Sequence, residues 1–154
     1  LVTTYLPRAY ATPDDLEARA HMMSAAAMGA TAFQKGLGAI HAMSHPVGAV
    51  FNTHHGTTNA VCMPAVLAFN ADAIRGRFDQ AAAYLGIDGG FDGFCEFVQQ
   101  FNDSFAIPRT LTEMGVSADR LDDLVAMALE DPSCGGNPVE LTADSLRGLF
   151  RACF

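Results

Sequence analysis

The residues best able to do chemistry in this sequence are histidines, and they are concentrated in one place. Four of the five histidines fall within fifteen consecutive positions, as His41, His45, His54 and His55. The surrounding stretch, residues 36–71, contains no Asp, Glu, Lys or Arg. Imidazole is a good ligand for iron, zinc, copper and nickel. The cluster therefore predicts a metal site.

The spacing of these histidines suits such a site. A helix over residues 37–50 would place His41 and His45 on one face, one turn apart. A turn at residues 52–56 would let His54 or His55 fold back towards that face. A zincin-type protease is excluded, because Ala42 stands where the H-E-x-x-H motif needs its general-base glutamate. A catalytic metal site also needs a carboxylate or a third imidazole, and this window has no carboxylate.

Other polar residues have a plainer interpretation. Any one of the clustered histidines, taken alone, is equally well explained as a core or surface residue satisfied by the backbone. His21 has no partner nearby in the sequence, so a structural role is preferred for it. The acidic residues between 122 and 131 are interpreted as a solvated helix face. They are Asp122, Asp123, Glu130 and Asp131.

The elements that must position the cluster are helices. Apolar residues recur at helical spacing almost throughout, and no segment alternates apolar and polar residues as a strand does. The predicted fold class is all-α, with a kink or break near Met63 caused by Pro64. Thr12, Ser117 and Thr142 are predicted helix N-caps. The predicted helices cover residues 13–35, 37–50, a segment capped by Thr57 or Thr58, 72–85, 91–105, 118–129 and 143–153, and residues 131–138 form a loop.

Composition limits the partners. The chain has 154 residues, enough for one domain, and 9 basic against 17 acidic residues give a net charge of -8. This balance excludes nucleic acid and anionic membrane surfaces as expected partners. Four scattered cysteines and the absence of a signal-peptide pattern indicate a reduced, cytoplasmic protein. The start at Leu1, which lacks an initiator Met, suggests a chain entered partway through.

Two segments carry a resemblance to a known family. They are Gly36-Leu-Gly-Ala-Ile-His-Ala-Met-Ser-His-Pro-Val-Gly-Ala, and Asn52-Thr-His-His-Gly-Thr-Thr-Asn-Ala followed by Pro64. This pattern resembles the iron-containing (group III) alcohol dehydrogenases. Further landmarks extend the likeness over the whole chain. They are Tyr5-Leu-Pro-Arg, Asp15-Leu-Glu-Ala-Arg, Ile107-Pro-Arg-Thr-Leu, Asp131-Pro and Asn137-Pro.

The resemblance implies a fold and a site. Residues 1–154 would form the C-terminal helical, metal-binding domain of the iron-containing alcohol dehydrogenase and dehydroquinate synthase-like fold, without the N-terminal α/β cofactor-binding domain. His41 and His55 fall on the family's last two metal ligands. His45 falls on the catalytic histidine that faces the nicotinamide and the substrate. The family's other two ligands come from an Asp-x-x-x-His segment that residues 1–40 lack.

The resemblance also implies an activity. The parent polypeptide would be an NAD- or NADP-dependent dehydrogenase in which Fe(II), with Zn(II) as an alternative, lowers the pKa of a small alcohol during its interconversion with an aldehyde or ketone. The full-length enzyme is expected to be a homo-oligomer. The 154 residues alone are expected to bind metal weakly and to be inactive, and an apolar face over residues 41–69 is expected to be exposed and to cause self-association.

Three other interpretations stay open. The parent could be a maleylacetate reductase, a glycerol dehydrogenase or a dehydroquinate synthase, which share the architecture. The chain could instead be a stand-alone helical metal-binding or metal-sensing module, which predicts a tight metal site without further residues. A purely structural or interaction domain predicts that substitutions of the histidines leave every activity of the parent unchanged.

Overall fold

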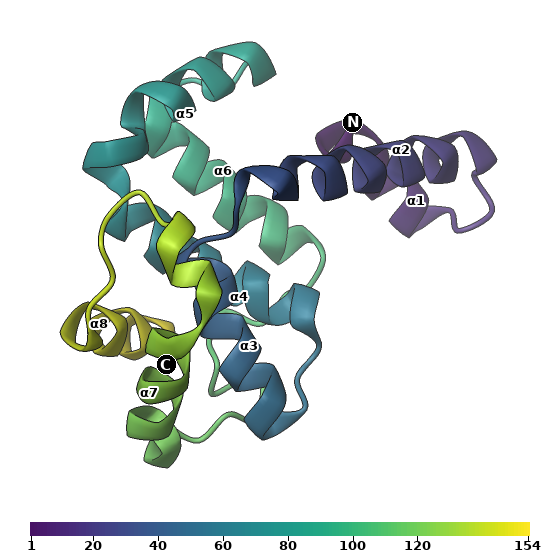
Figure 1. The fold of residues 1–154 in the computed structure, drawn as a ribbon. Helices are drawn as coiled ribbons and strands as arrows, with labels where there is room; N and C mark the ends of the chain where they lie inside the picture. Colours follow the sequence, from purple (N-terminus) through teal and green to yellow (C-terminus); the bar gives the residue numbers. More distant parts are fainter. The chain divides into compact units, whose positions relative to one another are not determined.

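The computed structural model describes all 154 residues, and every regular element is a helix (Figure 1). The predicted all-α class is confirmed. The chain divides into two compact units, Leu1–Gly36 and Leu37–Phe154. None of the helices combines the length and the apolar character that crossing a membrane requires.

The first unit is a helical hairpin. Helices α1 (Val2–Ala11) and α2 (Leu16–Ala32) are antiparallel neighbours, and a short 3-10 turn, η1 (Phe33–Lys35), ends the unit. The sequence patterns did not predict α1. The predicted cap at Thr12 is wrong, because the side chain of Asp15 accepts the N–H of Ala18 and α2 begins at Leu16.

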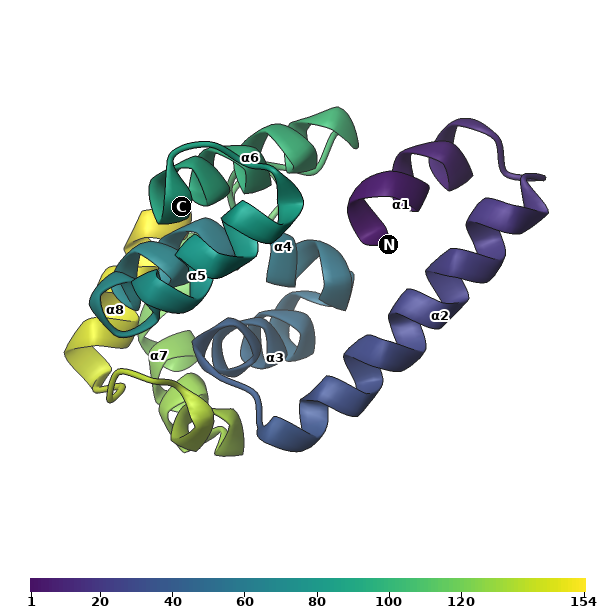
Figure 2. The ribbon, with the colours of Figure 1, turned by 90° about the horizontal axis from the view of Figure 1, so that it is seen from above.

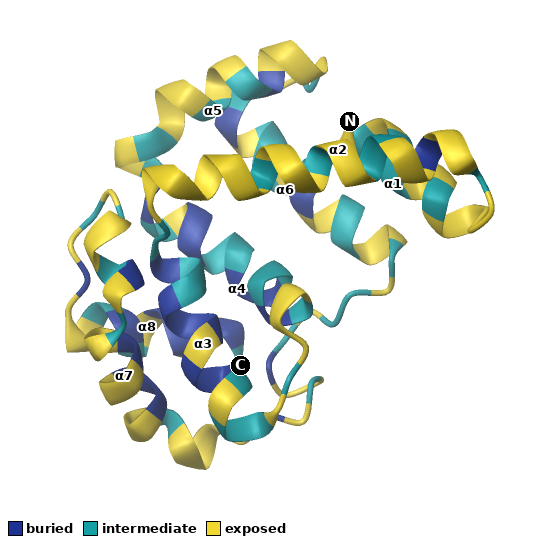
Figure 3. Ribbon diagram, turned by 45° about the vertical axis from the view of Figure 1, so that its right-hand side comes forward, coloured by how far each residue is buried: buried dark blue, intermediate teal, exposed yellow.

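Few side chains are buried in this hairpin. Arg8 bridges Asp15 and Glu17 at 2.8 and 2.7 Å, and the ring of Tyr5 stacks on His21 with 3.9 Å between centroids. This stacking contact is consistent with the structural role that the sequence favoured for His21. Ala18 is the one buried residue of α2, and most of the helix is exposed (Figure 3). Its exposed large apolar side chains are Leu16, Met23 and Met28.

The second unit contains the histidine cluster and six α-helices. They are α3 (Ala39–Phe51), α4 (His55–Phe69), α5 (Ala71–Leu85), α6 (Gly90–Ser104), α7 (Leu121–Glu130) and α8 (Ala143–Cys153). Two 3-10 segments, η2 (Ala118–Arg120) and η3 (Pro132–Gly136), flank α7. Ser117 and Thr142 are N-caps, as predicted, and Thr142 forms a capping box with Ser145. The 131–138 segment, predicted as a loop, contains η3.

The main core lies between α3, α4, α7 and α8. Met43, Leu124, Leu146 and Phe150 are fully buried in it, and burial of each such side chain contributes about 1.5–3 kcal/mol. A second, smaller core forms where α5 and α6 lie side by side, around Phe91 (Figure 2). Helix α3 is therefore held on several sides, and its backbone is a rigid support for the histidines.

Helix α4 continues through Pro64, so no break occurs near Met63. A proline has no N–H, so the carbonyl of Ala60, four residues earlier, loses its helical partner. The side chain of Asn102 on α6 donates to that carbonyl at 3.2 Å. A residue from a neighbouring helix thus supplies the missing hydrogen bond, and the helix continues.

The predicted exposed apolar face over residues 41–69 is also wrong. No large apolar side chain of that segment is exposed. The charge-free stretch is apolar because α3 and α4 supply much of the core, which covers those side chains.

Candidate metal and proton-transfer site

Three of the four clustered histidines come together between α3 and the start of α4. His41 and His45 project from α3, and His55 is the first residue of α4. The ring centroids are 5.6 Å apart for His41 and His45, 5.2 Å for His41 and His55, and 5.4 Å for His45 and His55. His54 has another role, because its Nδ1 accepts the N–H of Thr57 and caps α4. This cap replaces the predicted Thr57 or Thr58.

The turn between the two helices brings His55 back to α3. Asn52 ends α3 with a left-handed backbone (φ 52°), which Asn tolerates better than most residues. Thr53 then bonds Thr58 across the turn, hydroxyl to hydroxyl, at 2.8 Å. Thr58 is fully buried. The turn is therefore fixed by its own polar contacts, and His55 follows it directly.

His45 is held by an acidic residue far along the chain. Its Nδ1 lies 2.8 Å from Oδ2 of Asp131, the residue that precedes η3. The Asp131 side chain is only 13% exposed, so its interpretation as part of a solvated acidic face is wrong. Burial alone would raise the pKa of Asp131, but hydrogen bonds from Ser133 and His45 outweigh burial and lower it.

The state of Asp131 decides the tautomer of His45. With its pKa lowered, the carboxylate is ionised at neutral pH and can only accept a hydrogen bond. The Nδ1 atom of His45 must therefore carry a proton and donate a hydrogen bond to Asp131. In the neutral ring, Nε2 is then the acceptor nitrogen. The His45 side chain is 41% exposed, so the ring is within reach of solvent.

His41 is kept in its neutral form. Burial lowers the pKa of His41 from the ordinary value of 6.5, and the charges that His55 and His45 can carry lower it further. The negative charge of Asp131 opposes this shift without cancelling it. A metal ligand must be the neutral imidazole. The surroundings of His41 therefore favour the form that can bind a cation.

A fourth residue, Asn59, contacts the rings of both His41 and His55. Its Nδ2 lies 3.1 Å from Nε2 of His55 and 3.4 Å from Nε2 of His41. Its Oδ1 is buried and has no hydrogen-bond partner. Sequence reasoning missed Asn59 and Asp131. Asn59 stands one helical turn after His55, which was a usable signal, whereas Asp131 is 86 positions from His45.

The residues present fit part of a metal site. The Nε2 atoms of His41 and His55 converge on one amide group, so both lone pairs already point towards one small region. Asp131 is engaged by His45 and is not aimed at that region. No group of three or more His, Cys, Asp and Glu residues in the chain is arranged to hold a metal ion. The chain thus offers two candidate ligands, fewer than a catalytic metal centre needs.

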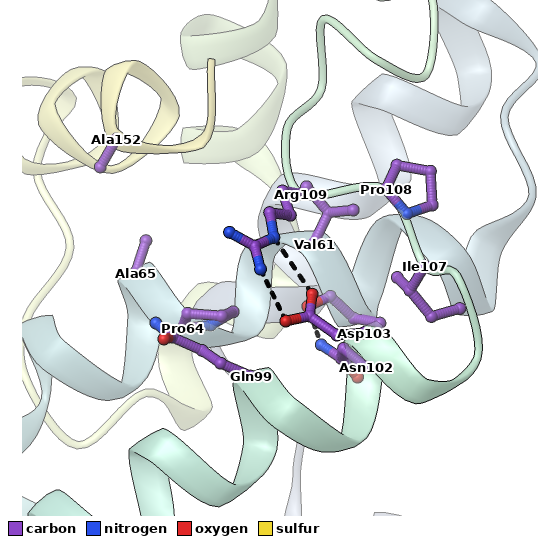
Figure 4. Close-up of a pocket in the computed structure, with 11 residues that line it drawn as sticks. Val61, Pro64, Ala65, Gln99, Asn102, Asp103, Ile107, Pro108, Arg109 and Ala152 are labelled. Atoms are coloured by element: carbon purple, nitrogen blue, oxygen red, sulfur yellow. Dashed lines mark hydrogen bonds and ion pairs between the residues drawn. The ribbon is translucent and has the colours of Figure 1, made fainter.

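A separate cavity of about 240 Å³ lies elsewhere in the same unit, between α4, α6 and the segment that follows α6 (Figure 4). Arg109 and Asp103 form two parallel hydrogen bonds at its edge, at 2.7 and 3.1 Å. No histidine lines this cavity.

The chain belongs to the iron-containing alcohol dehydrogenase family. The family described as "Fe-containing alcohol dehydrogenase family, C-terminal" matches residues 1–154. The assignment confirms the resemblance inferred from the histidine segments, and the helical fold matches the C-terminal domain of these enzymes.

Characterised relatives support this assignment. The 4-hydroxybutyrate dehydrogenase of Cupriavidus necator is 40% identical over 95% of this chain and 40% of its own length. The NAD-dependent methanol dehydrogenase of Bacillus methanolicus is 35% identical over 98% of this chain and 42% of its own length. A crystal structure of 1,3-propanediol oxidoreductase superposes with a TM-score of 0.91 and 28% identity, over 97% of this chain and 41% of that one. The chain thus spans about two fifths of the length of these relatives.

Proposed function

We propose that this chain is the helical part of a cytoplasmic NAD(P)-dependent alcohol dehydrogenase. In this proposal, His41 and His55 hold Fe(II), with Zn(II) as the alternative, and His45 faces the nicotinamide and the substrate. The remaining ligands and the cofactor-binding domain would come from a preceding α/β domain. The three gathered imidazoles, in a chain of this family, are the observation that carries this function.

The two kinds of histidine would have different tasks. The bound cation would supply Lewis-acid chemistry, lowering the pKa of the alcohol and polarising the carbonyl in the reverse direction. His41 and His55 would present neutral Nε2 atoms to it. His45 would take up the proton of the alcohol at Nε2, because its Nδ1 proton is held by Asp131. The ionised Asp131 would also stabilise His45 while it carries both protons.

A chimera tests the assignment directly. Residues 1–154 would be joined to the part of the Cupriavidus necator 4-hydroxybutyrate dehydrogenase that lies outside its matching segment. We expect Fe(II)-dependent reduction of NAD or NADP with 4-hydroxybutyrate or another small alcohol. His41→Ala and His55→Ala should each reduce activity by at least about 100-fold and lower the metal content, because a ligand matters more than the residues that support it.

His54→Asn is the matched control for these variants. Asparagine can still cap α4, and His54 does not join the three rings. This variant should therefore keep its metal and its activity. His45→Ala should keep its metal but lose turnover. Normal activity and metal content in His41→Ala and His55→Ala would contradict the proposed function.

The stand-alone metal module makes the opposite prediction for the 154 residues alone. Titration of the chain with Zn(II) in a calorimeter separates the two. Two imidazoles should give only weak binding, whereas a complete site would bind tightly. Tight binding that disappears in His41→Ala would favour the module and contradict the proposal of a shared site.

A further inference from the structure

The side-chain amide of Asn59 contacts the Nε2 nitrogens of both His41 and His55. It lies one turn after His55 on α4, while His41 lies on α3, so its amide bridges the two helices at the site. The distances from Nδ2 are 3.1 Å to His55 and 3.4 Å to His41, and both end at Nε2.

The chemistry of an amide sets the state of both rings. Nδ2 carries two N–H groups and no acceptor, so it can donate one hydrogen bond to each ring. A neutral imidazole accepts only at the nitrogen that lacks a proton. Both Nε2 atoms must then be unprotonated, with the protons of His41 and His55 on Nδ1. This is the tautomer that binds a metal through Nε2.

The other end of the amide is not held. Oδ1 of Asn59 is buried and has no hydrogen-bond partner. A buried carbonyl oxygen without a partner is unfavourable, so the amide does not keep its place by contacts on that side. The two imidazoles are therefore what orients Asn59, and Asn59 in turn orients them.

We propose that Asn59 is a positioning residue that sets the tautomer and the aim of both metal-ligand histidines before a cation arrives, an inference that rests on the proposed function for its purpose. The amide occupies both Nε2 lone pairs in the metal-free chain. A bound cation would need the same two lone pairs, so Asn59 would have to give up both hydrogen bonds to it. Asn59 thus holds the rings of His41 and His55 in the orientation for metal binding without itself being a ligand.

The first test is nitrogen NMR of the metal-free chain, labelled with nitrogen-15 in its histidines and held at pH 8. In the wild type, Nε2 should be the unprotonated nitrogen in both His41 and His55. Asn59→Asp keeps the size but replaces the donors by acceptors, so the proton should move to Nε2 in both rings. Asn59→Leu should give a mixture of tautomers. His45, which is held by Asp131, is the internal control and should keep its Nδ1 proton in all three proteins.

Several outcomes would overturn this role for Asn59. A proton on Nε2 of either ring in the wild type would do so without any variant, and so would tautomers that are the same in all three proteins.

A second experiment follows the side-chain NH₂ signals of Asn59 while Zn(II) is added. They should shift together with the His41 and His55 signals, and unchanged NH₂ signals beside shifted ring signals would also refute the role. If Zn(II) shifts neither ring, the metal-ligand assignment fails, whereas the tautomer result still decides the role of Asn59 in the free chain.

Discussion

A single methyl group at Gly136 should disrupt the support of α3. A Cβ built on Gly136 lies 1.9 Å from the carbonyl oxygen of Leu37, whereas ordinary contacts of this kind exceed 3.0 Å. Gly136→Ala therefore forces the two backbones apart by about 1 Å. The neighbouring Asn137 accepts the N–H of Ala39 at the start of α3 and exchanges two side-chain hydrogen bonds with the buried Asn70.

The cost can be estimated from these contacts. Overpacking typically costs about 1–3 kcal/mol. Weakening the hydrogen bonds of Asn137 adds roughly 1–2 kcal/mol, because each is worth about 0.5–1.5 kcal/mol. The free energy of unfolding should fall by about 3 kcal/mol. With a urea m-value of about 2 kcal/mol/M, the midpoint should fall by about 1.5 M.

Gly135→Ala is the matched control, because a Cβ at Gly135 meets nothing within 4 Å. Its free energy of unfolding should stay within about 0.5 kcal/mol of the wild type. Urea unfolding followed by circular dichroism compares the two variants, and hydrogen exchange of the Ala39 amide reports on the start of α3. Equal midpoints for Gly135→Ala and Gly136→Ala, with an equally protected Ala39 amide, would refute this account of the η3 contact.

Three further predictions concern other parts of the chain. Thr142→Ala should lower the free energy of unfolding by about 1 kcal/mol in urea titrations, since it removes the capping box of α8, and Thr142→Ser should not. Cys62 and Cys153 are buried and should resist a thiol reagent until the chain unfolds. Burial raises the pKa of Cys95 and Cys134, so their labelling should be slow at pH 7 and should accelerate as pH rises and thiolate forms. Amides of α2 should exchange with deuterium faster than those of α3, because almost no side chain of α2 is buried.

The sequence was sufficient for the part of the site that depends on local structure. His41 and His45 share a face because four residues make about one helical turn. His55 was expected near them because a turn separates two helices. Both inferences use spacing along a few residues, and the gathered rings confirm them. Spacing alone did not choose between His54 and His55, because the choice depends on which residue caps α4, and only the family resemblance pointed to His55.

The rest of the site depends on contacts between distant segments. Asp131 looked like a surface residue because other acidic residues precede it on α7. Its pairing with His45 exists only because η3 packs beside α3. The same reason explains why α4 continues through Pro64, since the donor that replaces the lost hydrogen bond, Asn102, comes from another helix. Local sequence patterns predict the secondary structure that a segment favours. The surroundings of Asp131 and Pro64 depend instead on residues from distant segments that pack against them.

The loop from Asp131 to Asn137 therefore fixes α3 at two levels. Asp131 holds the ring of His45, and Asn137 holds the backbone at the first residue of the helix. His41 lies between these two contacts on the same rigid helix. Because α3 carries both side chains, a shift of the loop would act on His41 and His45 together, whereas His55 lies on α4. A shift of the loop would therefore change the distance between His41 and His55, which Asn59 spans. A cation shared by these two rings would depend on that distance.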